Sequence, residues 1–400
     1  MKSRLCMLVV IALLVIPGSG FAQNPDVAFI HGLDGSSSTW SAVANALNTS
    51  LLIDRSTPSY TSYASISSTA TSLYPSLQDN SIVIGHSLGG LLSRQMYVTP
   101  ASHNKVGKLI TVGTPHIGAK IANNVDNGLV GDYVNLWLQE LTYGPAYAAG
   151  SLLFGPDWAY GSYWVIEYVM GNIVDQVGAY IEDQFEDNRP VVGDLHEASQ
   201  YLYGLNMSES MYGNTMPSAR FALIGYETSN SYMSHIRLME SAENNSVENG
   251  AWLDDVMDFA NYYYYGAVTY WLLSDYYYFA YLDTYNLDYY YYSWWYGLVG
   301  NAWYIGYSNL VYYQDMDWSY LNGSLRQDGD DLILYNDDGL LSTYSQGVPA
   351  FFDDGNRVYF LQNTNHIEET KNTSTVRTGL TYVLTLPEYG VQRRSHYQEQ

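Results

Sequence analysis

Short apolar runs along the chain predict the strands of a buried parallel sheet. Each run contains β-branched residues and ends in a cluster of small or polar residues, and helical patterns separate the runs. Strands buried on both faces show this continuous apolar pattern, and the helices between them are typical of βαβ units. The predicted strands are Val27–Ile30, Ser81–Ile84, Lys108–Val112, Phe221–Tyr226 and Arg357–Leu361. Helical spacing of Trp40, Val43 and Leu47 predicts a helix after the first strand. We therefore expect a doubly wound α/β sheet, in which active sites lie beyond the carboxyl ends of the strands.

Two long segments interrupt the sheet pattern. The first, residues 121–217, contains a helical stretch from Trp164 to Phe185 with its apolar residues on one face. The second, residues 228–326, is rich in tyrosine and tryptophan and includes the run Tyr262–Tyr265. We interpret both as mainly helical caps inserted into one catalytic core, because the composition changes at both ends of each. The core then consists of residues 23–120, 218–227 and 327–400.

The first residues have the pattern of a signal peptide. Lys2 and Arg4 precede an apolar run from Leu5 to Ile16, and small residues around Ala22 suit a signal peptidase. The run is shorter than the roughly 20 apolar residues that span a bilayer. We expect cleavage of residues 1–22 and export to the periplasm or the medium, without a transmembrane segment in the mature chain. An uncleaved membrane anchor is the alternative.

The cysteine content indicates what stabilises the mature chain, and the net charge excludes some classes of partner. The only cysteine, Cys6, lies in the predicted signal peptide, so the mature chain relies on its hydrophobic core instead of disulfides. Loss of Lys2 and Arg4 changes the formal net charge from −24 to about −26. Such a molecule repels polyanions, which argues against nucleic acid as a partner.

The segment Gly85-His86-Ser87-Leu88-Gly89 is the strongest chemical signal in the chain. A predicted strand precedes it, and helical spacing follows it until Pro100. This strand–turn–helix setting is the one in which a G-x-S-x-G segment presents a nucleophilic serine. The turn strains the serine backbone, so the positions two before and two after the serine, here Gly85 and Gly89, accept only very small residues. We predict Ser87 as the nucleophile; an inert serine in a glycine-rich turn is the alternative.

A second segment, His31-Gly32-Leu33-Asp34-Gly35, directly follows the first predicted strand. A main-chain N–H from this loop, together with that of Leu88, would bind the oxyanion of a tetrahedral intermediate. Leu33 is the predicted donor in the loop. We expect His31 to brace the turn instead of taking part in catalysis.

Together these segments resemble bacterial lipases and related esterases of the α/β-hydrolase fold. The resemblance rests on His31-Gly32-Leu33, on Gly85 through Gly90 and on Gly113-Thr114-Pro115-His116. It covers about Pro25 to Lys120 and resumes near Asp330, but it does not cover the two caps. In that family the catalytic residues follow one another as Ser, Asp and His.

The resemblance also implies the acid. Asn336-Asp337-Asp338-Gly339-Leu340 is similar to the segment that carries the catalytic aspartate in such lipases, and the Asp before Gly-Leu is Asp338. The extra acidic residue, Asp337, remains an alternative. An aspartate in this role holds the imidazole in one tautomer and stabilises the imidazolium.

The base is expected after the last strand. Asn365-His366-Ile367-Glu368 is similar to the family's histidine segment, which implies His366 as general base. We expect His86 to shape the pocket. In some of these lipases a carboxylate at the position of Glu368 contributes to a structural calcium site. A lone glutamate indicates metal only weakly, so no cofactor is required by this interpretation.

The sequence thus predicts a secreted serine hydrolase that cleaves carboxylic esters through an acyl-enzyme. Aromatic and aliphatic residues in the caps favour lipid or other acyl esters and a transient contact with a lipid interface. The same tyrosines equally suit packing between helices, and sugar stacking is a third use. Acyl transfer or amide hydrolysis on the same fold remains an alternative, as does a binding module that has lost activity. The intact set of Ser87, Asp338 and His366 argues against the last.

Overall fold

The computed structural model describes residues 23–130, 189–212, 216–227, 234–249, 251–308, 311–312, 314–328, 331–348, 351–352 and 356–394. Two sequence predictions lie outside these residues. They are the signal peptide of residues 1–22 and the helix predicted from Trp164 to Phe185.

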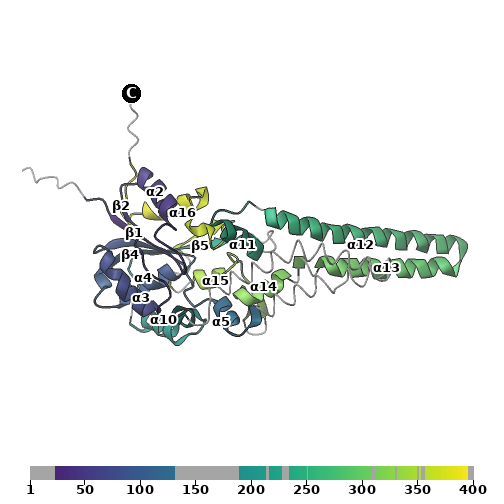
Figure 1. Ribbon diagram of the computed structural model, residues 1–400, viewed down its shortest axis with the longest axis horizontal. Coiled ribbons are helices and arrows are strands. Elements are labelled where there is room, and N and C mark those ends of the chain that lie inside the picture. The colour runs from purple at the N-terminus through teal and green to yellow at the C-terminus, as the bar shows by residue number, and fades with distance from the viewer. Residues whose placement is uncertain are drawn as a thin grey trace, which may run out of the picture.

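A sheet of parallel strands lies at the centre of the globular part of the described chain (Figure 1). The order of its strands is β2-β1-β3-β4-β5-β8. Its strands are β1 (Asp26–Ile30), β2 (Asp54–Ser56), β3 (Ser81–His86), β4 (Val106–Val112), β5 (Arg220–Tyr226) and β8 (Val358–Gln362). All five predicted strands are present, and the expected α/β-hydrolase architecture is confirmed. The edge strand β2 has the sequence Asp-Arg-Ser, whose exposed polar side chains give no apolar signal.

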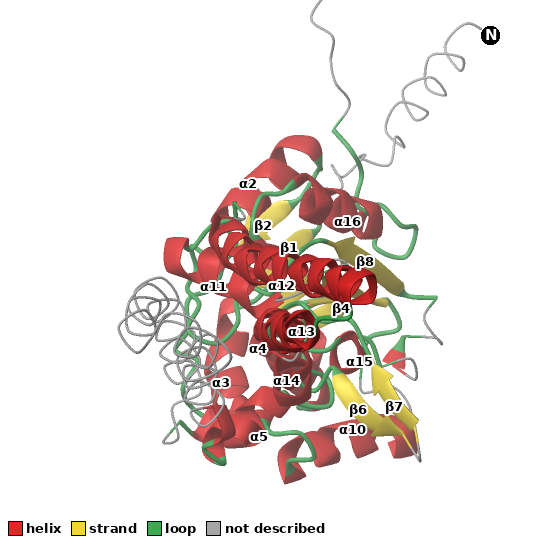
Figure 2. Cartoon of the chain, turned by 90° about the vertical axis from the view of Figure 1, so that its right-hand side faces the viewer, coloured by secondary structure: helices red, strands yellow, loops and turns green. Residues whose placement is uncertain are grey.

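Helices cover both faces of the sheet (Figure 2). On one face α3 (Ile66–Leu73) and α4 (Leu88–Val98) share a core with Val83 of β3. On the other, α2 (Ser41–Ser50) and α16 (Ser374–Leu384) share a core with Ile82 and Ile84. Successive side chains of a strand point to opposite faces, so one strand supplies both cores. The central strand β3 is buried along its whole length, and this packing holds the turn that follows its carboxyl end in place.

The other described elements lie in the segments between these strands and helices. They are η1 (Tyr74–Ser76), η2 (His103–Lys105), α5 (Lys120–Asp126), α9 (Pro190–Leu195), α10 (Gln200–Tyr212), α11 (Ser234–Asn244), α12 (Ala251–Thr284), α13 (Leu287–Ser308), α14 (Gln314–Asn322), β6 (Leu325–Asp328), β7 (Asp331–Leu334), α15 (Thr343–Gln346) and η6 (Glu368–Thr370). Strands β6 and β7 form an antiparallel pair apart from the central sheet.

Helices α12 and α13 form an antiparallel hairpin that projects away from the sheet (Figure 1). At about 1.5 Å per residue, the 34 residues of α12 extend about 51 Å. Small residues let the helices approach: a Cβ on Gly266 would lie 2.3 Å from Trp303, and one on Gly300 would lie 2.6 Å from Trp271. Within the described residues, no helix combines the length and apolar character needed to cross a bilayer.

Candidate active site

Ser87 occupies the sharp turn between β3 and α4. Its φ of 51° and ψ of −122° lie where a non-glycine residue is strained, and its N–H donates to the Val112 carbonyl at 2.9 Å. The flanking glycines have no room for a side chain. A Cβ on Gly85 would lie 2.5 Å from the Gly89 oxygen, and one on Gly89 would lie 2.5 Å from the His31 oxygen. The geometry is that of a nucleophile elbow.

The loop after β1 passes directly over this turn. A Cβ on Gly32 would come within 2.9 Å of the Ser87 Cβ, so only glycine allows the contact. Leu33 and Ser87 line the same cavity. Leu88 begins α4, and the first amides of a helix have no acceptor within it. The two predicted oxyanion donors therefore flank Ser87 from two separate elements.

His31 is part of the support for this loop. Its buried ring stacks on Tyr60 with centroids 4.0 Å apart, and its Nδ1 lies 2.9 Å from the Gly32 oxygen, to which it donates. Burial lowers the pKa of His31, more than the bond to Gly32 raises it. The stacking and this hydrogen bond join His31 to the turn that contains Gly32.

Asp338 and His366 come together beyond the carboxyl ends of β7 and β8. His366 Nδ1 lies 2.8 Å from Asp338 Oδ2, and the His366 N–H donates to the Asp338 main-chain oxygen at 2.9 Å. Asp338 is completely buried, and its Oδ1 accepts the N–H groups of Leu340 and Leu341 at 2.9 and 2.6 Å. Gln346 Nε2 donates to Oδ2 at 3.0 Å. Burial raises the pKa of Asp338, and the imidazole and main-chain donors oppose that rise.

Asp337 makes a different set of contacts. Its Oδ1 accepts from the Ser234 hydroxyl at 2.6 Å and from the Gly339 N–H at 2.8 Å, and its Oδ2 accepts from the Ser324 hydroxyl at 2.9 Å. These bonds join the loop to α11 and to the start of β6. Of the two adjacent aspartates, Asp338 is thus the one whose carboxylate contacts the His366 imidazole, and Asp337 closes the loop behind it.

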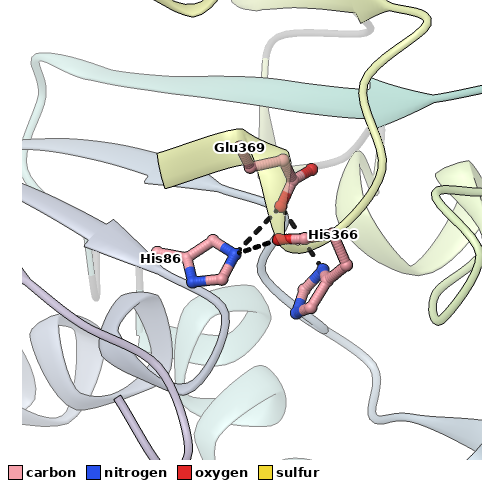
Figure 3. A group of neighbouring side chains, drawn as sticks. All are labelled: His86, His366 and Glu369. Carbon is pink, nitrogen blue, oxygen red and sulfur yellow. Dashed lines mark hydrogen bonds and ion pairs between the residues drawn. The ribbon is translucent and has the colours of Figure 1, made fainter. Parts of the chain in front are cut away.

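A second buried carboxylate, which the sequence analysis does not include, contacts the same imidazole. Glu369 Oε2 lies 3.3 Å from His366 Nδ1 and 3.1 Å from His86 Nε2 (Figure 3). Its Oε1 accepts the Gly225 N–H at 2.9 Å. His86 Nε2 is also 3.0 Å from the His366 main-chain oxygen, so this nitrogen carries the proton. Burial alone would lower the pKa of His366, but the carboxylates of Asp338 and Glu369 outweigh burial and raise it.

Two glycines make room for Glu369. Gly113, after β4, has a φ of +54°, and a Cβ there would lie 1.7 Å from Glu369 Oε2. A Cβ on Gly225 in β5 would lie 2.2 Å from Oε1. Position 113 of the Gly113-Thr114-Pro115 segment is therefore occupied by glycine because a larger side chain would overlap Glu369. The sequence signal for Glu369 is an acidic residue three positions after His366. Because Glu368 stands directly before it, the sequence alone does not show which of the two glutamates contacts the histidine.

Glu368 points elsewhere. Its Oε1 accepts the Glu248 N–H at 2.9 Å. Glu227 and Glu248 interact electrostatically with Glu368, and their carboxylates lie 3.1 and 3.2 Å from the Arg237 guanidinium. Calcium requires six to eight oxygen ligands, and a cation already faces this group. These surroundings do not fit the structural calcium site that the resemblance implied at Glu368.

Five of the predicted site residues line one cavity of about 590 Å³. Its wall includes Gly32, Leu33, His86, Ser87 and His366. The apolar part of the lining includes Leu195, Leu340, Leu341 and Ile367, and the polar part includes Ser36, Ser38, Thr39, Asn245 and Lys371. Leu195 belongs to the first interrupting segment and Asn245 to the second, so both contribute to the wall.

Comparison with known proteins agrees with this fold. A family model described as the PGAP1-like alpha/beta domain matches residues 61–143. The mature form of the Bacillus licheniformis lipase BlEst2 is 13% identical, with 90% of this chain and 93% of that chain covered and a TM-score of 0.43. A thermophilic esterase from Thermogutta terrifontis is 13% identical, with 55% and 77% covered and a TM-score of 0.28.

An extracellular α/β-hydrolase from a Paenibacillus species is 15% identical, with 50% of this chain and 76% of that chain covered and a TM-score of 0.26. No curated protein matches the sequence significantly. The fold assignment rests on the strand order and on the match of residues 61–143 to the family model. The chain has the α/β-hydrolase fold, and residues 61–143 match the model of the PGAP1-like alpha/beta domain.

Proposed function

We propose that this protein is a secreted serine hydrolase that cleaves carboxylic esters, with Ser87 as nucleophile, His366 as base and Asp338 as acid. The observation that carries the proposal is that Ser87 and His366 line one cavity, with Asp338 bonded to His366 behind its wall. Ser87 stands in a strained elbow, His366 lines the same wall, and Asp338 holds the Nδ1 of that histidine.

Each step of ester cleavage has a group on this chain. With Nδ1–H bonded to Asp338, His366 has Nε2 free to take the Ser87 proton as the hydroxyl oxygen attacks the ester carbon. The N–H groups of Leu33 and Leu88 stabilise the oxyanion. The imidazolium then gives its proton to the departing alcohol, which leaves an acyl-enzyme. Water, activated by the same imidazole, attacks that ester and releases the acid and Ser87.

The cavity and the hairpin favour an acyl or lipid ester as substrate. Leu340, Leu341 and Ile367 give the cavity an apolar wall beside Ser87. The hairpin exposes many aromatic side chains, among them Tyr285 at 77% and Trp294 at 57%. Residues 251–308 contain six aspartates and no lysine or arginine. Tyrosine and tryptophan suit a lipid–water interface, and the charge restricts that interface to uncharged or zwitterionic lipid.

The nucleophile is tested with a fluorophosphonate probe. We expect the wild type to be labelled and Ser87→Ala to remain unlabelled. Equal labelling of both proteins would remove Ser87 from this role. A series of p-nitrophenyl esters from acetate to palmitate tests the substrate class, and a strong preference for acetate would contradict a lipid substrate.

The export part of the proposal rests on the predicted signal peptide. Expression of the full chain in a bacterial host, followed by mass measurement of the exported protein, is expected to find Gln23 as the first residue. Retention of residues 1–22 in a membrane fraction would contradict cleavage.

A further inference from the structure

The residue that follows the predicted oxyanion donor is held in an unusual conformation. Asp34 has a φ of +52°, in the left-handed region that non-glycine residues avoid. The turn around it is tight: the Gly35 N–H donates to the Gly32 oxygen at 3.2 Å, and a Cβ on Gly35 would lie 2.8 Å from the His31 ring. A strained residue persists only when its surroundings hold it.

Part of that hold comes from the chain before α3. The Asp34 N–H donates to the Ser62 hydroxyl at 3.0 Å, and the Tyr60 hydroxyl donates to the His31 main-chain oxygen. These bonds fix the backbone on both sides of Leu33. They leave the Asp34 side chain to a partner from elsewhere.

That partner is Arg189, which caps the start of α9. Arg189 Nη1 lies 2.7 Å from Asp34 Oδ2, and its guanidinium lies 4.3 Å from the centre of the Tyr63 ring. Both charged side chains are largely buried, at 15% and 16% exposure, which limits screening by water. Helix α9 is itself fixed, because Asp194 Oδ2 accepts the Ile66 N–H at 2.8 Å. The guanidinium is thus held between an aromatic ring and the oxyanion loop.

We propose that Arg189 is a positioning residue for the oxyanion hole, which fixes the Leu33 N–H through its ion pair with Asp34. This inference rests on the proposed function. Without the ion pair, Asp34 is released from its left-handed conformation, and relaxation of its φ displaces Leu33 relative to Ser87. A flat guanidinium stacks on a ring and pairs with a carboxylate at once, whereas a lysine ammonium retains only the charge.

The test measures the rate at which a fluorophosphonate labels Ser87 in the full chain. This rate depends on the nucleophile and on the oxyanion hole, and it needs no knowledge of the natural ester. Removal of a whole donor typically costs about 100- to 1,000-fold in rate, and displacement costs less. We therefore expect Arg189→Met to be labelled roughly 10- to 100-fold more slowly and Arg189→Lys to fall between it and the wild type.

A matched control exists at another site. Arg326 pairs with Glu197 at 2.5 Å, lies 4.8 Å from the centre of the Tyr344 ring and is 27% exposed. None of these three residues lines the cavity. Arg326→Met is expected to lose comparable thermal stability and to keep its labelling rate within about threefold. With p-nitrophenyl butyrate, Arg189→Met should lower kcat and leave KM within about threefold.

The double variant Arg189→Met/Asp34→Asn distinguishes an ion pair from two separate effects. If both residues act through one contact, the double variant is no slower than the slower single variant. Wild-type labelling rates in folded Arg189→Met and Arg189→Lys would overturn the inference, as would an equal loss in Arg326→Met. An unlabelled wild type would instead overturn the proposed function, and the inference with it.

Discussion

Replacement of Asp338 by Asn is the sharpest test of the proposed site, because the structure specifies which way the amide turns. The Leu340 and Leu341 N–H groups both donate to Oδ1 of Asp338, so an Asn oxygen is drawn to that position. The amide NH2 then faces His366 Nδ1 and stabilises the tautomer in which Nε2 carries the proton. That nitrogen is then unable to accept the Ser87 proton.

The size of the effect depends on Glu369. A wrong tautomer alone costs about 10,000-fold in kcat, or about 5.4 kcal/mol of transition-state stabilisation. Here a second carboxylate oxygen lies 3.3 Å from the same Nδ1 and still accepts its proton in part of the population. We therefore expect Asp338→Asn to lose roughly 100- to 1,000-fold and Asp338→Asn/Glu369→Gln to approach the full loss.

Asp337→Asn is the matched control, since the substituted carboxylate stands next in the chain and bonds to Ser234, Ser324 and Gly339 instead of His366. Its bonds to Ser234, Ser324 and Gly339 are expected to contribute about 1–3 kcal/mol to stability. The assay is kcat on saturating p-nitrophenyl butyrate, with urea unfolding of each variant. Equal activity losses in Asp337→Asn and Asp338→Asn, or no loss in either, would refute the assignment of the acid.

Three further predictions concern the surroundings of the site. The base must be neutral to act, and two carboxylates raise the pKa of His366, so kcat/KM should rise with pH only above about pH 6.5. Glu369→Gln removes one of these carboxylates and should move this rise to lower pH. An unchanged pH profile would contradict the role of Glu369. Gly113→Ala should cost roughly 1–3 kcal/mol in urea unfolding, because its Cβ overlaps Glu369; unchanged stability would contradict this packing. Replacement of exposed Tyr276 and Trp294 by Ser should weaken sedimentation with phosphatidylcholine vesicles and leave turnover of soluble esters unchanged; vesicle binding equal to the wild type would exclude the hairpin as the contact.

The sequence by itself determined the features that depend on neighbours in the chain. The apolar runs predict the buried strands because strands covered on both faces need continuous apolar residues. The sharp turn at Ser87 was predictable because strand, turn and helix stand in one stretch of chain, and the turn requires Gly85 and Gly89 within that stretch. His366 and the oxyanion loop followed from short segments that resemble those of a known family.

Only the tertiary structure decided between groups that the sequence presents alike. Asp337 and Asp338 are adjacent and chemically identical, and only their contacts distinguish them. Asp337 accepts a hydrogen bond from Ser234, 103 positions earlier in the chain, whereas Asp338 contacts the imidazole of His366, 28 positions later. Glu368 and Glu369 are likewise adjacent, and the 3₁₀ turn that contains them directs one toward Glu248 and the other toward His366. Arg189 reaches Asp34 across 155 positions. Local patterns do not encode such contacts, because packing brings the partners together only after the sheet has formed.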